Sequence, residues 1–245
     1  MRRRTTSLRR VLPDGTALHN RLLGALPARE YHRICEHLRM HPVRTGETLQ
    51  EHGAPISHVY FPNGGVYSIT NQMRDGALVE VATVGSEGML GIGAFFGDRS
   101  GAGRAFQQVG NGLLPAMPVA RFIKEIAIRG PLRDVVGLYA QANLLQTMQS
   151  TACNALHDVR RRCCRWLLQT HDRIETDDFR LKHEFLAVML GVRRPTVTVV
   201  MRSLQQAGLV SSHYGRIRIV RRKRLEAASC ECYDVIRGHF ARLGL

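Results

Sequence analysis

The segment LKHEFLAVMLGVRRPTVTVVMRSLQQAGLVSSHYGRIRIV, residues 181–220, is the part of the chain from which the fold follows most directly. A helix-turn-helix needs a small residue where its two helices cross and a glycine that turns the chain between them. Ala187 and Gly191 supply these residues, four positions apart. Pro195 is tolerated only in the first turn of a helix, so the second helix begins near Arg194. The segment therefore predicts a helix-turn-helix.

The residues after the second helix predict a β-hairpin. Two alternating stretches, 209–212 and 216–220, flank His213-Tyr214-Gly215, which places a glycine at the turn. A hairpin in this position is a wing, and its Arg216 and Arg218 are placed to touch DNA phosphates. A further helix over 159–168 precedes the motif. Three helices and a hairpin predict a winged helix-turn-helix.

The outward side chains of the second helix are the candidate base-reading residues. They are Arg193, Arg194, Thr196, Thr198, Val199 and Arg202. The N-terminal end of this helix enters the major groove in helix-turn-helix proteins. An arginine there can pair with guanine O6 and N7, which contributes about 1–3 kcal/mol of discrimination, and threonine and valine methyls suit thymine.

The charge of the chain is concentrated around this motif. The 245 residues carry a formal net charge of +15. Residues 1–10 hold five arginines and no acid, and residues 156–224 hold 16 Lys and Arg against six Asp and Glu, while the rest of the chain sums to zero. A basic excess confined to one block and a short arm indicates a polyanionic partner, most often nucleic acid.

The first half of the chain has a different pattern. Residues 17–40 have the apolar spacing of helices, and from residue 43 to 118 short strands alternate with tight turns. Asp75-Gly76 is a hairpin signal because these residues tolerate positive φ. This spacing predicts a small β-roll or jelly roll. The predicted strands are Val59–Phe61, Val66–Ile69, Leu78–Val84, Ala105–Val109 and Leu113–Met117.

A long helix is predicted from Pro131 to Leu156. Seven of its residues follow alternating steps of three and four, which is the seam of a coiled coil and predicts a dimerisation helix. The seam consists of Val135, Leu138, Ala142, Leu145, Gln149, Ala152 and Leu156. A second apolar face, with Tyr139, Leu144 and Met148, is available to pack on the roll. The alternative is one ordinary buried helix.

These predictions define an α+β protein with a β-roll (jelly-roll) sensor domain, a long dimerisation helix and a C-terminal winged helix-turn-helix. The expected boundaries are a basic arm over residues 1–16, the roll over 17–129, the dimerisation helix over 130–156 and the DNA-binding domain over 157–245.

The order of these parts resembles the Crp/Fnr superfamily of bacterial transcription regulators across residues 17–220. Val59-Tyr60-Phe61-Pro62-Asn63-Gly64-Gly65 is similar to the family's first strand and turn in the roll, and Arg74-Asp75-Gly76 to its following hairpin. Residues 191–198 are similar to the start of its recognition helix. The resemblance implies a homodimer that binds a palindromic operator in double-stranded DNA, regulates transcription and contacts RNA polymerase. It implies no enzymatic activity.

The sequence departs from the family at several functional positions. The Gly-Glu pair that holds a cyclic nucleotide's ribose aligns with Gly91-Ile92, and Arg104 lacks the hydroxyl residue that follows the phosphate-binding arginine. Binding of cyclic AMP is therefore not expected. No cysteine precedes Cys35, so an iron–sulfur cluster is not supported, and no histidine identifies itself as a haem ligand. Of the family's base-reading set only Arg194 is carried over, so a different operator is expected.

Two other classes of protein remain as alternatives. A cupin-like metal enzyme would need two histidines on one strand, and His37, His41, His52 and His58 lack that spacing. An unregulated architectural nucleic-acid-binding protein would need no sensor domain.

No cofactor and no metal are expected. Most of the six cysteines are interpreted as small apolar residues, with Cys230 and Cys232 diverging on a helix, and a redox role for one of them stays open. No apolar run approaches the length of a membrane span, so a cytoplasmic protein is predicted. The effector, the target genes and the choice between activation and repression do not follow from the sequence.

Overall fold

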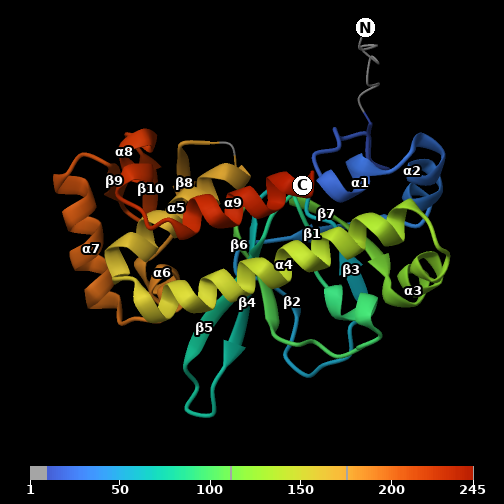
Figure 1. Ribbon diagram of the computed structural model, residues 1–245, viewed down its shortest axis with the longest axis horizontal. Helices are drawn as coiled ribbons and strands as arrows, with labels where there is room; N and C mark the ends of the chain where they lie inside the picture. Colours follow the sequence, from blue (N-terminus) through green and yellow to red (C-terminus); the bar gives the residue numbers. More distant parts are fainter. Residues whose placement is uncertain (1–9, 111, 175, 245) are drawn as a thin grey trace, which may run out of the picture.

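The computed structural model describes residues 10–110, 112–174 and 176–244 and has the predicted α+β architecture (Figure 1). A β-roll occupies one end of the molecule, a long helix runs across it, and a helical domain with a small sheet forms the other end. Of the predicted basic arm, residues 1–9 lie outside the described residues. Arg10 donates two hydrogen bonds to the carbonyls of Leu23 and Gly24. No helix within the described ranges is long and apolar enough to cross a membrane.

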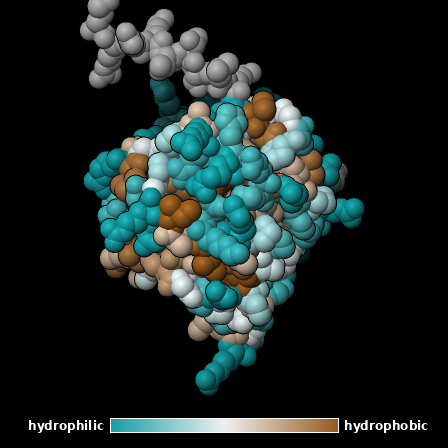
Figure 2. All heavy atoms as spheres, turned by 90° about the vertical axis from the view of Figure 1, so that its right-hand side faces the viewer, coloured by the Kyte–Doolittle hydropathy of each residue, from teal (hydrophilic) through white to brown (hydrophobic). Residues whose placement is uncertain are grey.

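The roll consists of two antiparallel sheets with strand orders β1-β7-β3 and β2-β6-β4-β5. Helices α1 (Arg21–Ala25), α2 (Ala28–Cys35) and α3 (Val119–Ala127) lie at its outer end, whose surface mixes hydrophilic with hydrophobic side chains (Figure 2). The strands are β1 (Arg39–Val43), β2 (Thr48–Gln50), β3 (His58–Tyr60), β4 (Val66–Gln72), β5 (Leu78–Val84), β6 (Arg104–Val109) and β7 (Gly112–Pro118), and a short 3-10 helix, η1 (Ile92–Phe96), follows β5.

All five predicted strands are present, and β5 has the predicted bounds. The sequence analysis missed β1 and β2. β1 contains Pro42, which cannot donate to a sheet ladder, and β2 has only three residues. Both depend on pairing with distant partners, β7 for β1 and β6 for β2, so no local pattern marks them.

The long helix α4 (Pro131–Leu156) has the predicted bounds, but part of its predicted seam is buried inside the chain. Val135 and Ala142 are buried in the chain's own core, whereas Leu144 and Met148 are 60% and 61% exposed. Apolar residues occur on every side of this helix, so more than one heptad phase fits the sequence. Val135 and Ala142 of the predicted seam are covered by the chain's own core and are not available to a second copy.

The C-terminal domain has the predicted three helices and wing. Its sheet has the order β8-β10-β9, and its last helix, α9, lies along α4 (Figure 1). Its core is continuous with the roll, because Val66, Phe106 and Val109 of the roll pack in the same cluster as Trp166. The elements are α5 (Val159–Ile174), β8 (Asp178–Arg180), α6 (His183–Leu190), α7 (Arg194–Gln206), β9 (Val210–His213), β10 (Arg216–Ile219), α8 (Arg222–Ala227) and α9 (Cys232–Arg242).

Candidate nucleic-acid interface

The turn between α6 and α7 has the geometry that the sequence predicts. Gly191 ends α6 with φ +61°, a left-handed conformation that glycine adopts without strain. The backbone N–H of Val192 donates to the carbonyl of Ala187 over 3.0 Å, which closes the helix end. Pro195 lies in the first turn of α7, which begins at Arg194. The turn and the proline together fix where the second helix points.

One face of α7 is buried and the other is free. Val197, Val200, Met201 and Leu204 pack into the domain core. Five of the six predicted base-reading residues of this helix and its cap are exposed: Arg193, Arg194, Thr196, Val199 and Arg202. Thr198 is half-buried. Its hydroxyl donates to the carbonyl of Arg194 and lies 3.3 Å from His183 Nδ1, so its methyl and not its hydroxyl is left for an outside contact.

The wing presents its two predicted arginines to solvent. Ile217 and Ile219 of β10 are buried, so the alternation of the strand exposes Arg216 and Arg218. Tyr214 stands at the tip with φ +47° and a fully exposed side chain. A non-glycine residue in this conformation is uncommon, and the following Gly215 also has positive φ, so the tip is a tight turn.

Two of the candidate arginines are paired with acids on the same domain. Arg194 lies 3.0 Å from Glu184, and Arg216 lies 3.0 Å from Asp178. All four side chains are more than two-fifths exposed. Exposed pairs of this kind contribute about 0–1 kcal/mol, so a phosphate or a guanine can displace the acid at little cost.

A groove of about 970 Å³ separates the start of α7 from the wing and reaches the roll. Arg194 and Arg216 line it, as do Arg180, Lys182 and His183. The sequence analysis did not single out these last three residues. Arg180 precedes the quoted motif, and the pairing of β8 with β10 places it opposite Arg216 of the wing. Lys182 and His183 lie at the start of α6, and no local pattern indicates that they face the groove.

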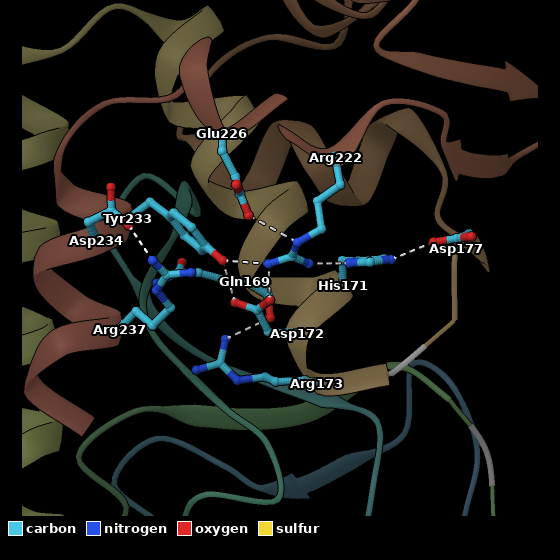
Figure 3. Close-up of polar contacts among 10 residues, drawn as sticks. All are labelled: Gln169, His171, Asp172, Arg173, Asp177, Arg222, Glu226, Tyr233, Asp234 and Arg237. Atoms are coloured by element: carbon cyan, nitrogen blue, oxygen red, sulfur yellow. Dashed lines mark hydrogen bonds and ion pairs between the residues drawn. The ribbon is translucent and has the colours of Figure 1, made fainter. Parts of the chain in front are cut away.

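A polar network on the far side of the domain joins α5, α8 and α9 (Figure 3). Arg222 of α8 donates to Asp172 of α5 and to the hydroxyl of Tyr233 on α9, and it also contacts His171. The Tyr233 hydroxyl donates to Asp172 over 2.9 Å. Burial, and then the charge of Asp172, raises the pKa of Tyr233 to about 12, so the hydroxyl remains a donor. The network therefore holds α9 against α5 and α8.

Arg104, which the sequence places near the family's phosphate-binding arginine, already has partners within the roll. Arg104 donates two hydrogen bonds to the Thr48 hydroxyl, over 3.0 and 2.7 Å, and lies 3.8 Å from a carboxylate oxygen of Glu51. Gly91 has φ +83° and leads into η1, whose first residue is Ile92.

The cysteines are arranged differently from the prediction. Cys230 precedes α9 and only Cys232 lies in it, so the two side chains do not diverge on one helix. Cys153, Cys230 and Cys232 are buried together as a separate cluster. The packing of α9 along α4 brings these three residues together.

Comparison with known proteins identifies the helical domain. Residues 161–228 match the Crp-like helix-turn-helix domain family. These residues therefore form a Crp-like helix-turn-helix domain.

Solved structures show that the whole Crp/Fnr-type fold is shared. A CRP-family transcriptional regulator from Thermus thermophilus is 18% identical, with a TM-score of 0.66 over 78% of this chain and 96% of that one. The c-di-GMP-responsive global regulator CLP of Xanthomonas campestris is 19% identical, with a TM-score of 0.66 over 80% and 100%. FixK2 of Bradyrhizobium japonicum is 15% identical, with a TM-score of 0.67 over 79% and 98%. No curated protein matches the sequence significantly.

Proposed function

We propose that this regulator binds a palindromic operator as a homodimer and inserts the N-terminal end of α7 into the major groove of each half-site. The observation that carries the proposal is the exposed row on and just before α7, in which Arg193, Arg194 and Thr196 face solvent above a buried helix face. Arginines at this end of a recognition helix reach guanine edges. Val199 and Arg202 continue the row by one turn.

The wing positions the protein on the DNA backbone. Arg216 and Arg218 project from the same face of β10, and Arg216 shares the groove with Arg194. Contacts to phosphate fix orientation and register and carry no direct base information. We therefore assign base reading to α7 and backbone contacts to the wing.

The homodimer forms through the free face of α4. Leu138, Leu145, Met148 and Ala152 follow steps of seven, three and four residues, which is coiled-coil spacing. Leu138 and Met148 are 41% and 61% exposed, and Leu156 at the helix end is 80% exposed. A second copy related by a two-fold axis would cover this apolar stripe and place two recognition helices on successive major-groove faces.

Regulation proceeds without cyclic AMP. Arg104 is engaged by Thr48 and Glu51, and no carboxylate follows Gly91 to hold a ribose. A contact with RNA polymerase is proposed on the Crp/Fnr resemblance alone.

Selection of binding sites from random duplex DNA tests the function. The purified chain should enrich one inverted repeat whose half-sites lie about one helical turn apart, and footprinting should protect both halves. Enrichment of no sequence, with uniform coverage of all duplexes, would contradict operator binding. Cyclic AMP and cyclic GMP added to the selected site should change neither the affinity nor the melting temperature, because a ligand that prefers the native state must stabilise it.

A further inference from the structure

Four side chains with metal-ligating atoms meet where α4 ends. Cys153 and His157 lie one helical turn apart at the end of α4, where His157 is the C-cap. Cys230 lies between α8 and α9, and Cys232 is the first residue of α9. The three sulfurs and one imidazole nitrogen all lie within 4.8 Å of one another.

Two of the distances between these atoms match a tetrahedral site for one metal ion. Zn–S bonds of about 2.3 Å and Zn–N bonds of about 2.0–2.1 Å place neighbouring ligand atoms about 3.5–3.8 Å apart. Cys153 Sγ lies 3.5 Å from Cys230 Sγ, and Cys232 Sγ lies 3.5 Å from His157 Nδ1. An iron–sulfur cluster would place several atoms between its ligands, and this spacing leaves no room for them.

The surroundings of these residues are those of metal ligands. His157 directs Nδ1 at the cysteines, and its Nε2 lies 3.3 Å from the carboxylate of Glu231, an arrangement that orients a metal-bound imidazole. Gln149 Nε2 donates to Cys232 Sγ over 3.0 Å. Such hydrogen bonds fix ligand sulfurs in place.

Packing alone does not account for the arrangement. Cys153, Cys230 and Cys232 are 0%, 3% and 1% exposed, yet their buried cluster contains no other hydrophobic residue. Arg162 and Arg165 are also buried, and the Nε atom of each has no hydrogen-bond partner among the residues that the structure describes. Both arginines interact electrostatically with Cys153. Three thiolates and a neutral imidazole around Zn²⁺ carry one net negative charge, which these buried cations would balance.

We propose that Cys153, His157, Cys230 and Cys232 bind one Zn²⁺ ion per chain. Three thiolates and one imidazole are a structural zinc set, and four protein ligands leave no open position for catalysis. The ion joins the end of α4 to the start of α9, across 77 residues of sequence. This site is independent of the proposed operator binding.

Metal analysis of the full chain tests the site. Purified protein is stripped with a chelator under reducing conditions, reloaded with Zn²⁺, desalted and measured for zinc by mass spectrometry. The unaltered chain should retain one zinc ion. Cys153→Ser, Cys230→Ser and Cys232→Ser should lose it, whereas the matched control Cys35→Ser on α2 should retain it. Equal zinc content in the unaltered chain and the three variants would overturn the proposal.

A cobalt experiment makes the result independent of whether a variant folds. The unaltered chain loaded with Co²⁺ should show the intense visible bands of a tetrahedral ion and thiolate-to-cobalt charge transfer in the near ultraviolet. Weak octahedral bands without charge transfer would overturn the proposal. A second result would also overturn it. In that result the purified chain contains a Cys153–Cys230 disulfide, and the chain binds no metal after this disulfide is reduced.

Discussion

Trp166 Nε1 of α5 donates a hydrogen bond to Glu80 Oε1 of β5, with 2.9 Å between the two atoms. This contact joins the DNA-binding domain to the roll. A bulge between β4 and β5 leaves Val81 without a partner beside Glu80, which re-aims the strand at this point. Ser68 donates to the other carboxylate oxygen over 2.6 Å. Because Trp166 is the only tryptophan of the chain, its fluorescence reports on this contact.

The protonation of Glu80 should make stability depend on pH. Burial raises the pKa of Glu80 from 4.5 to about 7, although the hydrogen bonds from Ser68 and Trp166 lower it. The folded chain therefore holds this proton more tightly than the unfolded chain. The resulting stabilisation is complete below about pH 4.5 and is lost as the pH rises through about 7, a change of roughly 1–3 kcal/mol.

Glu80→Gln, which resembles the protonated group, should remove this dependence. Urea unfolding at about pH 5 and about pH 8, followed by Trp166 fluorescence, measures the two free energies of unfolding. The unaltered chain should lose more stability between these pH values than the variant. An identical loss in both would show that Glu80 is not the group that titrates.

A buried ion pair forms a second link between roll and DNA-binding domain. Arg173 Nη2 of α5 lies 2.7 Å from Glu87 Oε1, and both side chains are at most 10% exposed. Burial raises the pKa of Glu87, but the charge and hydrogen bond of Arg173 outweigh it and hold that pKa below its usual value. Arg173→Met should therefore cost about 3–5 kcal/mol, because it leaves a buried charge unpaired.

The double variant Arg173→Met/Glu87→Gln should recover much of that loss, and thermal and urea unfolding measure it. The exposed pair Arg161–Asp158 is the control, since Arg161→Met should cost less than about 1 kcal/mol. A loss for Arg173→Met no larger than for the control would show that the buried pair does not hold the domains together.

A charge on the free face of α4 should produce monomers. Met148→Glu should disrupt the proposed dimer and abolish specific operator binding, while the fold of each chain persists because this side chain is 61% exposed. Ile128→Glu is the matched control, since Ile128 is 58% exposed but precedes α4. Sedimentation velocity gives the oligomeric state. A Met148→Glu variant that sediments as a dimer would place the interface elsewhere.

Base reading and backbone binding should separate in two arginine variants. Arg194→Ala should cost about 1–3 kcal/mol per half-site on the selected operator and little on unrelated duplex. Arg216→Ala should weaken binding to both DNAs alike, and the log–log salt dependence should become shallower by roughly one for each phosphate that the variant no longer neutralises. Arg29→Ala, an exposed arginine on α2, is the control. Equal weakening of both DNAs by Arg194→Ala would mean that Arg194 touches only the backbone.

The DNA-binding motif followed from sequence because its determinants are local. Ala187, Gly191 and Pro195 follow one another at steps of four residues. The alternation of Arg216 with Ile217 determines which side chains of the wing face solvent. The bounds of α4 followed for the same reason, since Pro131 begins the helix and the apolar repeat continues to its end.

Tertiary structure decided the features that join distant segments. Which face of α4 stays free depends on where the roll packs, and apolar residues on several sides of the helix do not encode it. Glu80 and Trp166 are 86 residues apart, and Cys153 and Cys230 are 77 apart. No periodicity links residues at such separations. Their meeting results from the packing of α5 against the sheet that contains β4 and β5, and of α9 along α4, which only the folded chain specifies.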